Sequence, residues 1–498
     1  MKKTILAMMM GVSLAGADVW TERFEIEHIA PPPGVDPQIG GLATLPDQRV
    51  IACFHRGEVM IYDPAKRAWS LFAEGLHEPL GILVEDERNV LVMQRPELTR
   101  LTDTDGDGVA DEYATVFDGF GMTGNYHEFA FGPARDAEGN FYVSLNVASN
   151  GAGIRKEIRG EWKEIGVPRE HMRGEKWGEN KEKAGRMYSR TPYRGWVLKI
   201  SPDGKKMTPF ACGFRSPDGI GFDAKGRLLV TDNQGDWLGT SKLHHVREGG
   251  FHGHPASLVW REGWQRNPLD VPVAELEKLR FPAAALLPQG ELANSPTQPV
   301  VVPEKGFGAF AEETLVGDMN QTKLFRFVMD EGIEGASQGA AISFFDSESL
   351  GRGNHRMTFT DDGSLWLGKT HLSWAGAEGL LRLRVKDEKA LAFTVKKMEA
   401  REGGFVLRLS EAADPESLQG LSLQSYRYTY HAQYGSPQMN REKHQPGLEW
   451  SEDGRELRVK LPKWRQGYVY ALNLKGLKSE AGQPLLGDQM YYHLIKKP

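Results

Sequence analysis

Cysteine is scarce in this chain, which has only Cys53 and Cys212 among its 498 residues. Two cysteines exclude a disulfide scaffold and a cysteine-rich zinc module, and without a Cys-x-x-Cys-His motif there is no attachment site for a c-type haem. Each cysteine lies in an apolar, strand-like run, VIACFH or FACGF. We therefore expect two buried free thiols, with a bridge as the less favoured alternative.

Neither sign of charge predominates, and the chain lacks long hydrophobic runs. The 61 Lys and Arg residues nearly balance 67 Asp and Glu residues, which gives a formal net charge of −6. This balance produces no global field that would attract nucleic acid. No run approaches the roughly 18 apolar residues of a membrane-spanning helix, and no kinase, P-loop or protease motif is present. We expect neither a nucleic-acid partner nor a transmembrane segment.

The N-terminus has the pattern of a signal peptide. Two lysines at positions 2 and 3 precede an apolar stretch over 5–14, and the small residues Ala, Gly and Ala follow at 15–17. A basic start, a short apolar run and a small-x-small cleavage pattern are what a signal peptidase accepts. We expect residues 1–17 to be removed, so that the mature protein begins at Asp18 in the periplasm or outside the cell.

Glycine and proline are abundant, with 57 and 28 residues, and a pattern of paired strands recurs along the chain. In each repeat an apolar strand runs into a polar turn, and a second apolar strand returns. The repeats are GGLATLPDQRVIACF, GILVEDERNVLVMQ, FAFGPARDAEGNFYVSL, GIGFDAKGRLLVTDN, MTFTDDGSLWLGK and the weaker FGAFAEETLVGDMNQTKLFRF. Short antiparallel strands repeated in this way are typical of propeller blades. The sequence predicts an all-β protein whose main domain is a six-bladed β-propeller.

The predicted domains follow from where this pattern stops. We place the propeller at 18–388, with insertions at about 150–195 and 255–305, and a small immunoglobulin-like β-sandwich at 390–498. The first insertion has an excess of Lys and Arg and is either a lid over the channel or a solvated decoration. The tyrosine-rich stretch at 426–434 either presents aromatic rings to a sugar or belongs to the sandwich core.

An acidic loop is the sharpest local motif. In DTDGDGVADE, carboxylates stand at Asp103, Asp105, Asp107, Asp111 and Glu112. Carboxylates at alternating positions around a glycine turn supply the oxygen ligands that Ca²⁺ prefers. The loop is not an EF-hand, because its twelfth position is alanine. We expect a calcium ion that staples a strand connection, and the alternative is an acidic surface turn.

Two further segments carry a family resemblance: GNYHEFAFGP…GNFYVSLN from Gly124, and CGFRSPDGIGFDAKGRLLVTDN from Cys212. Over about residues 36–387 the chain resembles the soluble sugar dehydrogenases that depend on pyrroloquinoline quinone (PQQ), including the aldose and L-sorbosone dehydrogenase-like propellers. The resemblance implies that His127 takes the proton from a sugar hydroxyl while hydride passes to the quinone. It also implies that Arg215 contacts the quinone carboxylates, which a guanidinium can bind bidentately.

The same resemblance assigns further positions. His127 and Arg215 are the expected catalytic residues, and the expected cofactor-binding residues are Arg215, Asn320 and Arg356. The loop that holds Ca²⁺ beside the quinone in the family is matched by Asn233, Gln234, Gly235 and Asp236.

The chain departs from the family at three of these positions. Asn320 stands where the family has a lysine, and Asn354 stands where it has an arginine. Ser241 aligns with the acidic residue that follows the metal loop. Two cations and one carboxylate of the family pattern are therefore replaced by neutral groups.

These features favour an exported enzyme that oxidises a sugar or a sugar-derived alcohol or aldehyde by hydride transfer to PQQ, with Ca²⁺ bound. Electrons would pass to a separate periplasmic acceptor, because the chain has no haem motif of its own. One alternative is a quinone-free propeller that acts as a metal-dependent lactone hydrolase or polysaccharide lyase. The other is a non-catalytic glycan-binding protein.

Overall fold

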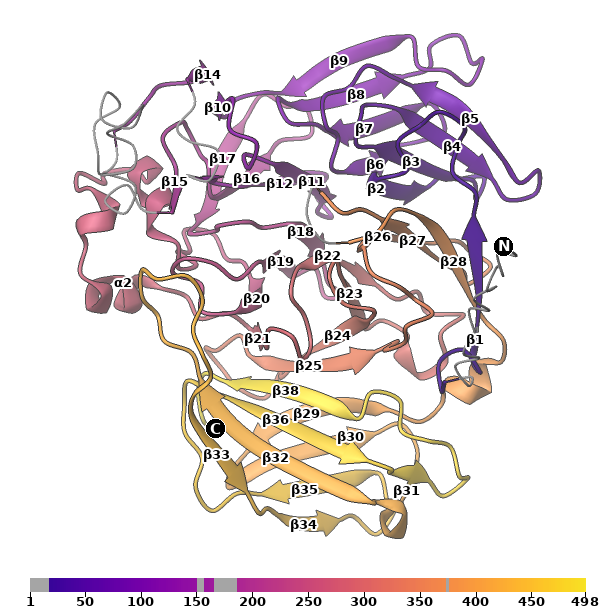
Figure 1. The fold of residues 1–498 in the computed structure, drawn as a ribbon, viewed down its shortest axis with the longest axis vertical. Helices are drawn as coiled ribbons and strands as arrows, with labels where there is room; N and C mark the ends of the chain where they lie inside the picture. Colours follow the sequence, from indigo (N-terminus) through magenta and orange to yellow (C-terminus); the bar gives the residue numbers. More distant parts are fainter. Residues whose placement is uncertain (1–17, 150–155, 165–185, 373–375) are drawn as a thin grey trace, which may run out of the picture.

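The computed structural model describes residues 18–149, 156–164, 186–372 and 376–498, and the predicted signal peptide lies outside them. Six blades of four antiparallel strands form a ring (Figure 1). The first strand of each blade contacts the first strand of the next, and the sixth returns to the first. The predicted all-β class with a six-bladed propeller is confirmed.

The first three blades follow the chain in order. They are β2 (Ile39–Thr44), β3 (Val50–Phe54), β4 (Val59–Asp63) and β5 (Ala68–Ala73); β6 (Ile82–Val84), β7 (Asn89–Met93), β8 (Leu98–Thr102) and β9 (Glu112–Phe117); and β11 (Ala130–Arg135), β12 (Phe141–Leu145), β16 (Trp196–Ile200) and β17 (Met207–Cys212). Every residue of β3 and β12 is buried, because a second strand is covered by the neighbouring blades on both faces. Their apolar runs are therefore continuous rather than alternating.

The remaining blades complete the ring. They are β18 (Gly219–Phe222), β19 (Leu228–Asp232), β20 (Ser241–His245) and β21 (Ala285–Leu287); β22 (Pro296–Val301), β23 (Thr314–Asp318), β24 (Leu324–Met329) and β25 (Gly339–Phe344); and β26 (Asn354–Phe359), β27 (Leu365–Lys369) and β28 (Gly379–Val385). The sixth blade takes its outer strand from the N-terminus, β1 (Phe24–Ile29), which pairs antiparallel with β28. This pairing joins the two ends of the ring by backbone hydrogen bonds and removes an unpaired edge.

The innermost strands approach so closely that glycine is required between blades. A Cβ atom on Gly81 would lie 1.6 Å from the carbonyl oxygen of Gly132 in the next blade. A Cβ atom on Gly219 would lie 2.1 Å from the carbonyl oxygen of Thr297. The glycines of the repeated strand pairs thus allow tight backbone packing around the axis.

The two long insertions occur within the third and fourth blades. The first contains β13 (Ala148–Ser149), β14 (Glu157–Arg159) and β15 (Met187–Tyr188), and much of the proposed lid lies outside the described residues. The second lies between β20 and β21 and contains η3 (Pro255–Trp260), η4 (Pro268–Asp270) and α2 (Val273–Leu279). The stretch at 255–305 therefore also includes β21 and β22, which are blade strands. No described helix is long and apolar enough to cross a membrane.

The C-terminal part has two layers of strands around one apolar core. One layer is β29 (Val395–Arg401), β30 (Gly404–Leu409), β35 (Glu456–Lys460) and β34 (Gly447–Trp450), and the other is β38 (Gln489–Leu494), β36 (Tyr468–Lys475), β32 (Gly420–Arg427) and β33 (Met439–His444). Phe405, Leu407, Tyr470 and Tyr492 lie in the shared core. The second layer continues blade five, because β38 pairs antiparallel with β25. One sheet of eight strands thus spans both parts of the molecule.

Both cysteines are buried and free, as predicted. Cys53 belongs to β3 and Cys212 ends β17. Burial raises the pKa of each thiol to about 12, so neither is a thiolate at physiological pH.

Candidate active site at the mouth of the propeller

A cavity of about 300 Å³ lies at one end of the propeller axis. Its walls come from loops that precede the first strands and follow the second strands of the blades. These loops meet at one end because the two strands are antiparallel. Four of the residues expected from the sequence line this cavity together: His127, Arg215, Asn233 and Gln234.

His127 stands at the cavity wall with one ring nitrogen already engaged. Its Nδ1 lies 3.0 Å from the carbonyl oxygen of Val147. Because a carbonyl can only accept, Nδ1 carries the proton and Nε2 presents a lone pair. Burial, reinforced by the Arg215 guanidinium, lowers the pKa of His127 to about 3. The imidazole is therefore neutral at physiological pH and can accept a proton.

The turn before β11 fixes the direction of this ring. The side-chain oxygen of Asn125 accepts from the backbone N–H groups of His127 and Ser149 at 3.0 and 3.2 Å. Its amide nitrogen donates to the carbonyl of Ser149 at 2.7 Å. Arg95 donates to the carbonyls of Asn125 and Tyr126 at 3.3 and 3.0 Å. The Asn-Tyr-His sequence is thus tied to two neighbouring segments.

Arg215 faces the same cavity and is held at both backbone and side chain. Asp232, the last residue of β19, accepts from the backbone N–H groups of Arg215 and Ser216 at 2.9 and 2.8 Å. The guanidinium carbon lies 5.6 Å from the ring centre of Tyr434. The terminal guanidinium nitrogens have no hydrogen-bond partner among the described residues. They are available to a carboxylate ligand.

The loop after β19 positions this guanidinium. A Cβ atom on Gly235 would lie 2.0 Å from Arg215 Nε, so glycine lets the arginine pass. Asp236 Oδ1 lies 3.4 Å from the same nitrogen, and Oδ2 accepts from the Met187 backbone and lies 3.1 Å from His254 Nε2. Burial raises the pKa of Asp236, but His254 and Arg215 outweigh it and hold the pKa below its ordinary value. Asp236 therefore holds Arg215, and calcium binding by residues 233–236 stays a prediction.

Asp218 adds a carboxylate to the cavity wall. Its Oδ1 lies 3.0 Å from His355 Nε2 and 3.3 Å from Arg356 Nη2. His355 Nδ1 lies 2.9 Å from the carbonyl oxygen of Ile39. Both ring nitrogens thus face acceptors, so this geometry places a proton between His355 Nε2 and Asp218 Oδ1. Burial lowers the pKa of His355 itself, against the attraction of Asp218. Burial raises the pKa of Asp218, but the nearby His355 and Arg356 lower it further than burial raises it.

The remaining expected cofactor residues do not line this cavity. Arg356 donates to four backbone carbonyls, those of Gly40 and Leu80 at 3.0 Å and those of His355 and Asp218 at 3.1 and 3.3 Å. Asn320 lies in the turn after β23, where its backbone N–H donates to Asp318. Asn354 donates to backbone carbonyls and accepts from Lys369 Nζ at 2.9 Å. Arg356 and Asn354 are thus bonded within the protein, and the cofactor assignments of Arg356 and Asn320 stay predictions.

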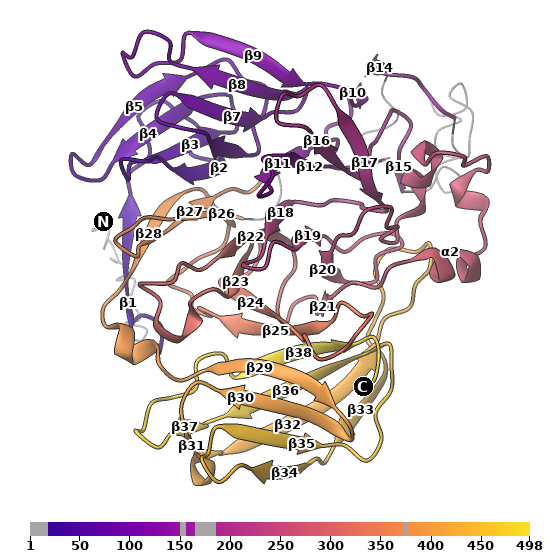
Figure 2. The same ribbon diagram turned by 180° about the vertical axis from the view of Figure 1, so that it is seen from behind.

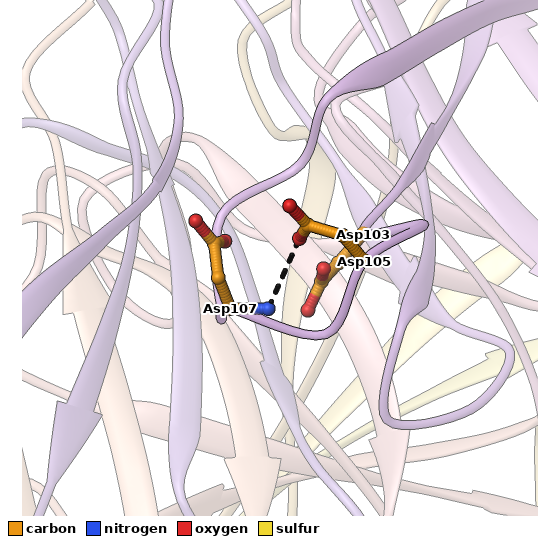
Figure 3. A group of neighbouring side chains, drawn as sticks. All are labelled: Asp103, Asp105 and Asp107. Carbon is orange, nitrogen blue, oxygen red and sulfur yellow. Dashed lines mark hydrogen bonds between the residues drawn. The ribbon is translucent and has the colours of Figure 1, made fainter.

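The predicted calcium loop lies elsewhere, between β8 and β9. Ligand atoms of Asp103, Asp105 and Asp107 lie within 4.8 Å of one another (Figure 3). Asp103 is buried and accepts from the backbone N–H groups of Gly106 and Gly108 at 2.6 and 3.0 Å. These bonds curl the loop so that its carboxylates converge.

The other two acidic residues of this motif do not join that group. Asp111 accepts from the backbone and hydroxyl of Thr104 at 3.1 and 2.7 Å. Glu112 is the exposed first residue of β9. Three of the five carboxylates are therefore brought together, and the role of the cluster as a metal site stays a prediction.

The sequence analysis did not assign Asp218 or His254 to the pocket and its wall, and it named Tyr434 only as part of the tyrosine-rich stretch at 426–434. Asp218 could have been found, because it belongs to the same Arg-Ser-Pro-Asp-Gly turn as Arg215. His254 lies in the second insertion, and nothing in the spacing connects it to Asp236. Tyr434 comes from the C-terminal part and pairs by an isolated β-bridge with Asp236. A contact between segments so far apart in the chain has no local sequence signal.

The fold and this site define a six-bladed propeller with a half-buried histidine and a guanidinium in one axial pocket. A family model described as a domain of unknown function, DUF7133, matches residues 63–254, which is less than half of the chain. A comparison with curated proteins finds no match.

Solved structures similar to this chain include propellers of the group that the sequence resembles. One is an oxidoreductase named as a glucose dehydrogenase from Thermus thermophilus, at 18% identity, 72% and 99% coverage of the two chains and a TM-score of 0.48. Another is the PQQ-bound aldose sugar dehydrogenase of Streptomyces coelicolor, at 14% identity, 73% and 99% coverage and a TM-score of 0.45. A third is a protein named as a gluconolactonase, at 13% identity, 73% and 92% coverage and a TM-score of 0.41. At these identities the similarity is one of fold.

Proposed function

We propose that the protein is an oxidoreductase that oxidises a hydroxyl or hydrated aldehyde group of a sugar or sugar-derived compound in the pocket at the propeller mouth. The orientation of His127 carries this proposal. Its Nε2 is left with a lone pair in the cavity by the Nδ1 contact with Val147. A positioned neutral imidazole removes the hydroxyl proton as the carbon is oxidised.

The pocket suits a polyhydroxylated ligand. One group of lining residues offers amide and hydroxyl groups: Ser216, Asn233, Gln234, Gln289, Asn294 and Ser295. Another group offers aromatic or apolar surface: Tyr126, Phe129, Phe131, Met319, Leu372 and Tyr434. A sugar has both hydroxyl groups and apolar ring faces, so it can use both kinds of wall.

PQQ remains our proposed hydride acceptor, and the donor set fits one of its carboxylates. The free terminal nitrogens of Arg215 would bind that carboxylate. The amides of Asn233 and Gln234 each use one N–H within the protein, toward Ser295 and the carbonyl of Gly239, and would donate the other to the ligand. When bound, PQQ supplies the two-electron acceptor that the amino acids cannot provide. We further propose export to the periplasm or beyond, a separate electron acceptor, and a structural Ca²⁺ at Asp103, Asp105 and Asp107.

A second candidate function is a quinone-free enzyme, such as a lactone hydrolase or polysaccharide lyase. The observation that favours it is the charge of the pocket. Arg215 is the one guanidinium among the described lining residues, and Asp218 lines the same cavity. PQQ has three carboxylates, and two of them would find no cationic side chain there. In this alternative His127 would activate water or remove a carbon-bound proton, and Arg215 would stabilise the resulting oxyanion.

A titration of PQQ into the chelator-treated full chain separates these functions. The dehydrogenase proposal predicts that PQQ binding, followed by absorbance, saturates at one equivalent. The titration is run with and without added Ca²⁺, and the two curves are compared. Arg215→Gln should weaken this binding, whereas His127→Asn should retain binding and lose sugar oxidation with an artificial acceptor dye. Absence of PQQ binding by the unaltered protein would contradict the dehydrogenase and direct the search to hydrolysis, lyase chemistry and glycan binding.

A further inference from the structure

A second cavity, of about 450 Å³, lies between the propeller and the C-terminal layers. Its propeller side is formed by β20, β21 and the end of α2, and its other side by the loop after β32 and by parts of β36 and β38. Figure 2 shows this loop reaching from the C-terminal layers to the side of α2. The cavity shares no lining residue with the pocket at the propeller mouth.

Lys242 of β20 places a buried amine in this cavity. The residue is 4% exposed. Its ammonium group makes no hydrogen bond and no ion pair with the described residues. Burial, reinforced by the nearby Arg280, lowers the pKa of Lys242 to about 7, although the charges of Asp232 and Glu277 act in the opposite direction. The amine is therefore only partly protonated at neutral pH. Since an unpaired buried charge is costly, an anionic ligand would supply the partner that the protein does not.

The other charged groups of the cavity leave an excess of positive charge. Arg280 and Arg427 line the cavity with Lys242, and Glu277 is the one carboxylate among the described lining residues. Glu277 already pairs with Arg280 Nη2 at 2.5 Å. A ligand carboxylate at Lys242 therefore meets attraction from Arg280, Arg427 and the protonated form of Lys242. It meets repulsion from Glu277, which is paired, and from Asp232, the neighbour of Lys242 on β19.

The cavity also offers aromatic surface. Trp237, Tyr428, Tyr430 and Tyr468 line it, and the rings of Trp237 and Tyr430 lie 5.4 Å apart. Aromatic faces of this kind pack against the apolar faces of sugar rings. A bare inorganic anion would leave this surface unused.

The cavity also contains a hydrogen-bond acceptor, the ring of His493. Nδ1 of His493 lies 2.7 Å from the carbonyl oxygen of Ala283, so it carries the proton and Nε2 presents a lone pair. Burial lowers the pKa of His493 to about 4, so the ring is neutral. His493 can therefore accept a hydrogen bond from a ligand hydroxyl but cannot add another cation.

We propose that this cavity binds an acidic sugar unit, a uronate, with its carboxylate at Lys242 and its ring against the tyrosines. The site would hold such a unit of a carbohydrate outside the pocket in which His127 acts. The segment after β32 lines both cavities, with Tyr428 and Tyr430 at one and Tyr434 at the other. The C-terminal layers would thus provide a second carbohydrate contact beside the propeller mouth.

The test is calorimetric titration of the full chain with D-glucuronate, D-glucose and acetate. We expect glucuronate to bind at least about tenfold more tightly than either D-glucose or acetate, because each control lacks one of the two recognised features. Lys242→Met should weaken glucuronate binding by about tenfold or more. Lys205→Met, at an exposed turn lysine, is the matched control and should leave binding unchanged.

Further variants keep the test decisive. Arg215→Gln removes the cation of the propeller pocket and should leave glucuronate binding unchanged, which separates this site from the proposed active site. Arg427→Ser alters an exposed cavity residue and should weaken binding by about threefold to tenfold even if Lys242→Met fails to fold. Binding that is lost in Arg215→Gln and kept in Lys242→Met would overturn the proposal. Equal affinity for glucuronate and acetate would overturn the sugar assignment.

Discussion

His127 and Arg215 approach one cavity from two blades, and each is fixed by groups that do not face the ligand. The Val147 carbonyl sets the tautomer of His127, and Asp232 sets the backbone of Arg215. Asp236 faces the Arg215 side chain. The base and the anion-binding group are therefore held in place before a ligand enters, which lowers the cost of orienting them.

The first prediction concerns His127 as the proton acceptor. His127→Ala should lower turnover by about 10²–10⁴, the usual contribution of a general base, and change the melting temperature little. His28→Ala is the matched control, because His28 is exposed in the outer strand β1. Steady-state kinetics and thermal melting of both variants check this. Full activity combined with a large loss of stability would make His127 a packing residue.

The second prediction uses Gly235 to move Arg215 without changing any charge. A Cβ atom would lie 2.0 Å from Arg215 Nε and 2.2 Å from its Cδ, so Gly235→Ala must displace the arginine side chain. We expect turnover to fall by about tenfold or more. The control is Gly447→Ala, where the nearest atom is Lys460 Cβ at 3.6 Å. Unchanged kinetics in Gly235→Ala would show that the position of Arg215 is unimportant.

At the scale of elements, the loop that connects β8 to β9 carries the carboxylate group of Asp103, Asp105 and Asp107. If it binds Ca²⁺, chelation should lower the melting temperature, because a ligand that binds only the folded state stabilises it. Asp105→Ala should abolish this response to chelator. Asp203→Ala is the control, because Asp203 is also exposed and also accepts a backbone N–H two residues on. If chelator does not change the melting temperature of the unaltered protein, a stabilising Ca²⁺ in this loop is ruled out.

The elements that the sequence revealed are those encoded by neighbouring residues. In five of the six blades the first two strands are joined by a short polar turn, so their repeat was visible in the printed sequence. In blade five, residues 302–313 lie between β22 and β23 and include η5 (Gly308–Phe310), which explains why its repeat was weaker. The pairing of β1 with β28 and of β38 with β25 could not be predicted, because the paired strands are separated by long stretches of chain. The same lack of a local sequence signal explains why only part of the pocket was predicted. His127 and Arg215 carried recognisable turns, whereas Tyr434 reaches Arg215 only through the tertiary fold.

For the whole molecule, the sheet shared by blade five and the C-terminal layers makes the two parts one structure. Removal of residues 389–498 would expose β25 as an unpaired edge and remove Tyr434 from the pocket. We expect the shortened chain to aggregate and to lose activity. Size-exclusion chromatography and kinetics check this. A monomeric, fully active 18–388 fragment would show that the propeller functions independently.

The last prediction concerns acid stability, which reports on several imidazoles whose pKa is lowered by burial. Burial is the leading cause that lowers the pKa of His127 and His252 to about 3 and of His245 and His493 to about 4. An unfolded histidine has a pKa of about 6.5, so below that pH the unfolded chain binds protons that the folded chain does not. The stability that these neutral rings contribute is therefore complete above about pH 6.5 and is lost as the pH falls toward the folded-state values.

Other groups modify this slope without reversing it. Burial raises the pKa of Asp318 to about 6, so this carboxyl takes up a proton in the folded state as the pH falls from about 6 to 4 and opposes the loss of stability. Burial also raises the pKa of Glu128, Asp232 and Asp488, whereas His244 and His355 have lowered pKa values and add to the loss. Each histidine contributes up to about 1.4 kcal/mol per pH unit. Melting at pH 7.5, 6.5, 5.5 and 4.5 should show a progressive loss, and His493→Gln should reduce the slope because its side chain cannot take up a proton. His28→Gln, at an exposed position, should leave the slope unchanged. A melting temperature constant from pH 7.5 to 4.5 would contradict the burial of these neutral rings.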